Sequence, residues 1–128
     1  MTPERATEVF AVVNFVVIGL SHLAQPRAWV EFFLLLRAKG YPAVFANGML
    51  SLLVGSIIVA FHNVWTGLPM VLTLVGWGQV LKGLLSLVAP AAGMKGLMRV
   101  SQERAYEFQV GGAMFLIISA LIVFSWTA

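Results

Sequence analysis

The chain contains neither cysteine nor aspartate, and it has few charged residues of any kind. Without cysteine it can form no disulfide, no thiolate metal site and no cysteine nucleophile. Charged residues make up 10% of its 128 residues, whereas a typical soluble domain has about 25%. So few charges cannot cover a water-facing surface, but a content of 60% hydrophobic residues suits a chain surrounded by lipid.

Four apolar stretches are long enough to cross a bilayer, which takes about 20 helical residues. They cover residues 8–24, 42–62, 68–88 and 105–126 of one domain, 1–128. The first stretch lacks the basic start and the small-residue cleavage pattern of a signal peptide, so we expect it to be retained as a span. The sequence therefore predicts an all-α integral membrane protein, a four-helix bundle.

Two further segments, 26–39 and 91–103, are too short to span and mix basic with apolar side chains. This pattern is typical of amphipathic helices that lie in the membrane interface. Both segments fall on one side of a four-span bundle. That side carries six basic residues, against Arg5 alone on the other: Arg27, Arg37, Lys39, Lys95, Arg99 and Arg104. The positive-inside rule places the two segments in the cytoplasm and both termini outside.

Each half of the chain reads as span, amphipathic segment, span, which suggests an internal repeat. An offset of 64 residues places Gly19 on Gly83, Pro26 on Pro90 and Gly48 on Gly112. Parallel repeats would be related by an axis along the membrane normal. A chance coincidence of common residues is the alternative interpretation.

Polar residues from all four spans fall near the predicted cytoplasmic level: His22, Asn47, Lys82 and Glu107. Gln79 shares a helix face with Lys82, three residues away. A lysine in hydrocarbon usually faces the bundle interior and is paired, so we expect Glu107 to be its partner. The group could form a ligand site. Alternatively, Lys82 extends to the headgroups, and Asn47 and His22 only bond helices together.

A second polar group, His62, Asn63 and Trp65, lies at the other predicted surface. It could form a site of its own, or Trp65 could be an aromatic-belt residue and Asn63 part of a turn. We expect a set of span glycines to let helices approach closely: Gly48, Gly55, Gly76, Gly83, Gly111 and Gly112. His22 and His62 lie too far apart to share a haem. With no catalytic triad and no metal-ligand spacing visible, we expect no metal, cofactor or enzymatic activity.

The pattern His62-Asn63-x-Trp65, Thr73-x-x-Gly76-Trp77, Lys82-Gly83 and Pro90 resembles a family of small, uncharacterised bacterial four-span membrane proteins. The match covers about a quarter of the chain. It implies the fold and a bacterial inner membrane, but no chemistry.

A weaker similarity, over Gly19 to Leu23 and the glycine-rich second span, is to DoxX-like proteins. Those often carry a glutamate in the second span, where this chain has Asn47. That difference argues against transferring their redox-partner role to this chain.

Two functional hypotheses follow from these observations. In the first, the protein is an accessory or interaction subunit that packs in the bilayer against another membrane protein, or against itself as an oligomer. In the second, it binds or transports a lipid headgroup, quinone or small anion at the level of Lys82. Nucleic acid is not an expected partner, because the chain has no patch of interleaved basic and aromatic residues.

Overall fold

The structure, a computed structural model, describes residues 1–127. That range holds helices and no strand: α1 (Pro3–Ala24), α2 (Pro26–Lys39), α3 (Tyr41–Phe61), α4 (Met70–Val88), α5 (Pro90–Met98) and α6 (Tyr106–Ser125), with a short 3-10 helix at Gln102–Arg104. Four of these segments are long and apolar enough to cross a membrane: α1, α3, α4 and α6. The prediction of an all-α chain with four helices able to cross a membrane is confirmed within the described residues.

Prolines mark the starts of several helices, since a proline in the first turn removes only an N–H that has no helical partner. Pro3, Pro26 and Pro90 begin α1, α2 and α5. The first helix starts at Pro3, earlier than the span expected from residue 8, because the Thr2 hydroxyl caps it by accepting a 3.1 Å hydrogen bond from the Arg5 N–H. Glu8 therefore lies inside a helix and not at its edge.

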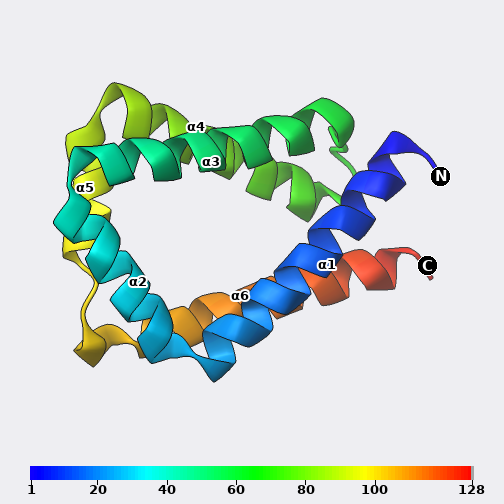
Figure 1. Cartoon of the computed structure of the whole chain (residues 1–128). Helices are drawn as coiled ribbons and strands as arrows, with labels where there is room; N and C mark the ends of the chain where they lie inside the picture. The colour runs from blue at the N-terminus through cyan, green and yellow to red at the C-terminus, as the bar shows by residue number, and fades with distance from the viewer. Residues whose placement is uncertain (128) are drawn as a thin grey trace.

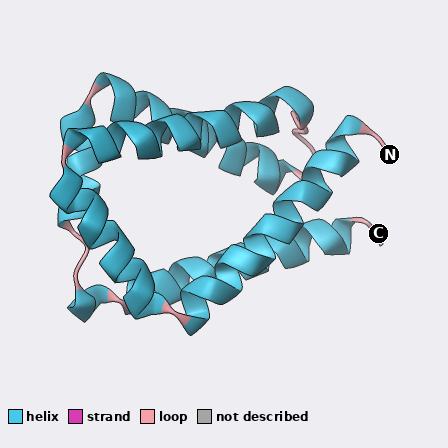
Figure 2. Cartoon of the chain, in the orientation of Figure 1, coloured by secondary structure: helices cyan, strands magenta, loops and turns pink. Residues whose placement is uncertain are grey.

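The four spans pack as two antiparallel pairs, α3 with α4 and α1 with α6 (Figure 1). Both termini and the turn at residues 62–69 lie at one end of the molecule, which we call the terminal end. The short helices α2 and α5 lie at the opposite end, which we call the connector end. Figure 2 shows that loops are confined to the corners of this helical frame.

The two helix pairs meet mainly toward the terminal end. A buried core there joins Ala11 and Phe15 of α1, Ile58 of α3, Leu72 of α4 and Ile122 of α6. Toward the connector end the pairs separate, and α2 and α5 cross between them (Figure 1). The molecule is thus closed by direct packing at one end and by its short helices at the other.

Within each pair, glycine allows close contact between the helix backbones. A Cβ atom on Gly83 of α4 would lie 2.9 Å from the Gly48 carbonyl oxygen of α3. In the other pair, a Cβ on Gly112 of α6 would lie 2.6 Å from the Gly19 carbonyl oxygen of α1. No side chain fits such a gap unless the backbones move apart.

Two more of the expected packing glycines, Gly55 and Gly76, also face the neighbouring helix at less than 3 Å from a would-be Cβ. Gly111 does not, and its expected role must be corrected: a Cβ there would meet no other atom within 4 Å. Successive residues point in different directions around a helix, and here the next residue, Gly112, is the one that faces α1.

The short segments expected at 26–39 and 91–103 do form helices, although α5 ends at Met98. Their interfacial location and the 64-residue repeat stay predictions.

The neighbouring glycines of α6 provide a matched test of this packing. Gly112→Ala should lower the free energy of unfolding by about 1 to 3 kcal/mol, because the new methyl group meets the α1 backbone. Gly111→Ala should leave it unchanged or raise it by up to about 1 kcal/mol, because the methyl group enters open space and alanine favours a helix more than glycine does. Thermal unfolding of both variants in mild detergent measures the difference, and equal melting temperatures would contradict the α1–α6 contact.

Candidate functional site

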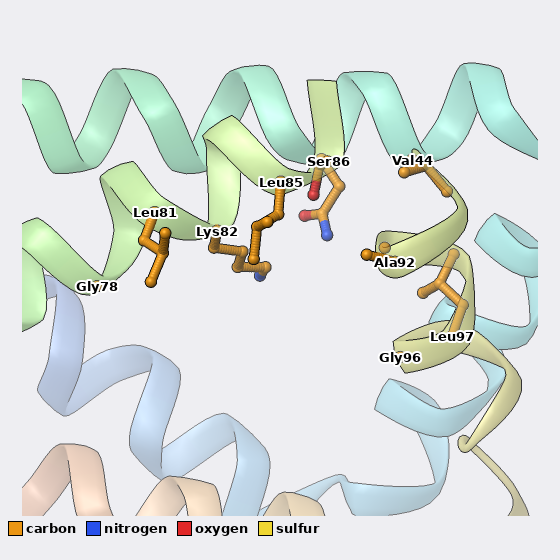
Figure 3. Close-up of a pocket in the computed structure, with 11 residues that line it drawn as sticks. Val44, Gly78, Leu81, Lys82, Leu85, Ser86, Ala92, Gly96 and Leu97 are labelled. Carbon is orange, nitrogen blue, oxygen red and sulfur yellow. The ribbon is translucent and has the colours of Figure 1, made fainter. Parts of the chain in front are cut away.

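A cavity of about 340 Å³ lies at the connector end, between α3, α4 and α5. Its lining is mostly apolar or glycine, with three polar side chains: Val44, Asn47, Gly78, Leu81, Lys82, Leu85, Ser86, Ala92, Gly93, Gly96 and Leu97. In Figure 3, Leu81, Lys82 and Leu85 extend from α4 into the opening, and Ala92 and Leu97 lie on the α5 side. The cavity thus combines an apolar wall with a small polar group at one level.

Lys82 is the only charged residue in this lining. No carboxylate among residues 1–127 lies within ion-pair distance of its ammonium group. Asn47 of α3 and Ser86 of α4 supply the other polar side chains of the cavity. The sequence therefore correctly placed Lys82 and Asn47 together. The cavity that these two side chains line can accept an acidic group from outside the chain.

Glu107 is not the partner of Lys82, and this expectation must be corrected. Arg99, just after α5, donates a 2.7 Å hydrogen bond from Nη2 to Glu107 Oε1. This hydrogen bond raises the pKa of the Arg99 guanidinium above its usual value. Arg99 lies at the start of the connection that leads into α6, so its long side chain reaches the first turn of that helix. A salt bridge near the surface therefore takes the carboxylate that the spacing had assigned to Lys82.

Gln79 also lies apart from the cavity, although it is only three residues from Lys82. It faces α3, where its Cβ is 2.9 Å from the position that a Cβ on Gly55 would take. Three residues make slightly less than one helical turn, so the side chains of Gln79 and Lys82 point in different directions. Gln79 is therefore part of the α3–α4 contact and not of the cavity lining.

His22 belongs to the other helix pair and lies among aromatic rings. Its ring stacks on Trp29 of α2, with centroids 4.2 Å apart, and lies 5.6 Å from the ring of Phe108 of α6. Nδ1 is 2.8 Å from the Ile18 carbonyl oxygen, an acceptor that requires an N–H on this nitrogen. The expectation that His22 shares a site with Lys82 must be corrected, because His22 does not line the Lys82 cavity.

The polar group predicted at the terminal end divides into two parts. Trp65 and Asn63 stay exposed, and the Trp65 indole donates a 3.0 Å hydrogen bond to Asn63 Oδ1. His62 turns inward and is fully buried. Its Nε2 lies 2.7 Å from Glu8 Oε2, and its Nδ1 lies 3.1 Å from Thr73 Oγ1. His62 therefore links α1 to α3 and α4.

The same carboxylate also binds the end of α6. Trp126 donates a 2.7 Å hydrogen bond from its indole to Glu8 Oε1, and the Arg5 guanidinium lies 4.9 Å above the Trp126 ring. Sequence reasoning missed Glu8, Thr73 and Trp126, because Glu8 had been treated as the edge of a span. An ionisable residue beside an apolar run is a signal that could have revealed it, since such groups are paired when they lie within a bundle.

No family model, curated protein or solved structure matches this chain. The resemblance to the four-span family therefore stays a prediction. The case for function rests on the geometry of the two polar sites.

The buried pair and its exposed neighbour allow a direct comparison of stability. His62→Leu should lower the free energy of unfolding by about 1 to 3 kcal/mol, because Glu8 Oε2 loses its hydrogen-bond donor while Trp126 still donates to Oε1. Asn63→Leu should change it by about 0.5 kcal/mol or less, because Asn63 is exposed. Chemical unfolding in detergent, followed by tryptophan fluorescence, gives both values. Similar losses in the two variants would contradict the structural role of the pair.

Proposed function

We propose that the protein binds a membrane-soluble molecule that carries an acidic group, with that group at Lys82 and its apolar body along the α4–α5 wall. The observation that carries this proposal is the Lys82 ammonium group, which enters an apolar cavity and has no carboxylate partner among the described residues. A charged side chain within a span costs about 2.5 to 3.5 kcal/mol on insertion scales, and pairing offsets that cost. A carboxylate or phosphate on the ligand would supply the pairing.

The dimensions of the cavity support an occupant of modest size. Its volume of about 340 Å³ lies near the lower end of the range for small-molecule sites, about 300 to 1,000 Å³. Gly78 and Gly96 both line it, and a Cβ on either would meet no atom within 4 Å. These two glycines are not needed for helix packing, so their effect is to keep the cavity open.

We also propose that the two halves of the chain are parallel repeats, 64 residues apart. The ends of α1 and α4, at Ala24 and Val88, differ by this offset. The glycine contacts support it too. A Cβ on Gly19 would lie 2.9 Å from a carbonyl oxygen of α6, and one on Gly83 would lie 2.9 Å from the corresponding oxygen of α3. The same offset relates the two pairs of helices as well as their sequences.

The repeat allows the Lys82 cavity to be compared with the corresponding location in the first half. Positions 22, 29 and 33 hold His22, Trp29 and Phe33, which belong to one aromatic cluster with Phe108. The positions 64 residues later hold smaller side chains that line the cavity: Ser86, Gly93 and Leu97. A cavity of about 330 Å³ remains beside the aromatic cluster, and no charged side chain is among its lining residues: Ser21, Gln25, Ala28, Trp29 and Phe32. What sets the second half apart is therefore the lysine and not the presence of an opening.

The orientation predicted from the basic residues would place the connector end, and so the cavity, at the cytoplasmic side of a bacterial inner membrane. A ligand would then enter from the inner leaflet or the cytoplasm. The alternative function, an accessory subunit or an oligomer, remains a prediction. The exposed apolar side chains are spread over all four spans, as contact with lipid alone requires, and they mark no particular face for a partner.

Replacing the lysine tests the proposal directly. Native mass spectrometry of protein extracted with its lipids in mild detergent should show one retained small molecule. Lys82→Met should lower its occupancy about ten- to a hundredfold, because a charge-assisted hydrogen bond is lost. Lys95→Met is the matched control, since Lys95 is exposed and does not line the cavity. Equal occupancy in both variants would contradict the proposal, and a second polypeptide bound in fixed ratio would favour the subunit.

Filling the cavity is a second, independent test. Gly96→Phe should abolish binding of the retained molecule while the melting temperature stays the same or rises, because the ring enters open space. Gly96→Ala should leave binding nearly unchanged, since a methyl group takes up little of the volume. If the phenylalanine variant binds as well as the original protein, the ligand lies elsewhere.

A further inference from the structure

The buried contact between Glu8 and His62 takes no part in the proposed ligand site, which lies at the opposite end of the molecule. Of the ion pairs within residues 1–127, it is the one in which both side chains are buried, with 8% and 0% of their surfaces exposed. Ionisable groups in a membrane-spanning bundle are costly and usually functional. The geometry around His62 indicates what this pair can do.

The Thr73 hydroxyl is the feature that gives the pair two stable arrangements. It has a single proton but two acceptors at nearly equal distance: His62 Nδ1 at 3.1 Å and the His62 carbonyl oxygen at 3.2 Å. Its own oxygen accepts a 3.0 Å hydrogen bond from the Val64 N–H. Rotation of the Thr73 hydroxyl therefore decides whether Nδ1 faces the hydroxyl proton or a lone pair of the hydroxyl oxygen, and no heavy atom has to move.

Each direction of the hydroxyl suits one protonation state of the histidine. When the hydroxyl donates to the carbonyl oxygen, Nδ1–H can donate to Thr73 and Nε2–H to Glu8, which is the pattern of an imidazolium. When the hydroxyl donates to Nδ1, the ring is neutral and keeps only the Nε2–H that donates to Glu8. The two states differ by one proton, and in both of them every polar atom of the ring has a partner.

Water reaches the pair at Glu8. A cavity of about 410 Å³ opens at the terminal end and is lined by Met1, Glu4, Arg5, Glu8 and Trp126, among other residues. Glu8 thus lines this cavity and also contacts His62, which has no exposed surface of its own. The carboxylate is therefore the part of the pair that meets water, whereas Nδ1 faces Thr73.

The charges around the pair come from one helix. Glu4 and Arg5 of α1 line the cavity with the Met1 amino group, and Arg5 Nε lies 3.6 Å from Glu8 Oε1. Within the described residues, α3, α4, α6 and the turn at 62–69 contribute no charged side chain at this end apart from His62. A proton on His62 therefore supplies the one positive charge with which the α3/α4 pair attracts the Glu8 carboxylate of α1.

We propose that Glu8 and His62 form a proton-binding site, filled from the aqueous phase at the terminal end, whose occupancy sets how tightly the α1/α6 and α3/α4 pairs close against each other. One proton taken from water converts neutral His62 to imidazolium and turns the Thr73 hydroxyl to the His62 carbonyl. Its release to water reverses both changes. The attraction between the two helix pairs is stronger in the protonated state, so the terminal end closes as the pH falls. This site does not depend on the ligand proposed for Lys82.

Nitrogen NMR of the full chain in lipid nanodiscs, with ¹⁵N-labelled histidine, tests the site between about pH 5 and pH 9, the range in which imidazole groups titrate. The chain has two histidines, and a His22→Gln variant assigns the signals. His62 should change by one proton at Nδ1 while Nε2 keeps its hydrogen. In Thr73→Val the change at Nδ1 should occur at lower pH than in the original chain, because a hydrogen bond to the charged form is stronger than one to the neutral form. A His62 that holds the same number of protons throughout would overturn the proposal.

The closure of the terminal end can be measured separately by distances between spin labels. The absence of native cysteine allows clean labelling of Thr66→Cys beside α4 and Thr127→Cys after α6, both at exposed positions. The mean distance should be shorter at low pH, with the same midpoint as His62, and Glu8→Gln should remove this pH dependence. A distance that does not change with pH would reject the coupling even if His62 titrates. A pH change that persists in Glu8→Gln would assign it to another group.

Discussion

The Glu8 carboxylate is the group on which the arrangement of this protein depends. A carboxylate buried within an apolar bundle must be surrounded by donors, and here two of them come from the ends of two other spans. His62 caps the end of α3, and Trp126 caps the end of α6; each places a ring nitrogen 2.7 Å from one carboxylate oxygen. One side chain of α1 thereby brings three helices to a common level and joins the two helix pairs.

The openness of the connector end follows from that arrangement. The terminal end combines the polar contacts of Glu8 with the apolar core around Leu72 and Ile122. At the connector end the pairs diverge, and α2 and α5 bridge the distance between them (Figure 1). On the α2 side aromatic rings around Trp29 line the space, whereas on the α5 side glycines line it beside Lys82. The two polar sites therefore occupy opposite ends of one frame and have different characters, one closed by internal pairing and the other open to a ligand.

Each helix pair is held together by close contact, because glycine lets the backbones touch with no side chain between them. Contacts between the two pairs lie mainly in the terminal core, in the Glu8 group and through the short helices.

Composition and local pattern are enough to predict much of this fold. Sparse charge and four apolar stretches predict membrane-spanning helices, because a chain within lipid must satisfy its backbone hydrogen bonds internally. The two short segments were also expected to begin within one residue of the observed starts of α2 and α5, at Pro26 and Pro90. The shared location of Lys82 and Asn47 also followed from counting helical rise along antiparallel spans.

Which polar groups meet is a property of the folded chain and could not be predicted from local pattern. Helical rise gives the depth of a residue but not the direction in which its side chain points, so Glu107 was placed beside Lys82 when it binds Arg99 instead. The contact between Glu8 and His62 joins residues 54 apart in the chain. It depends on the crossing of α1 over α3 and α4, which no local pattern encodes. Pairing between helices is set by rotation and packing of whole elements, and those are properties of the assembled bundle.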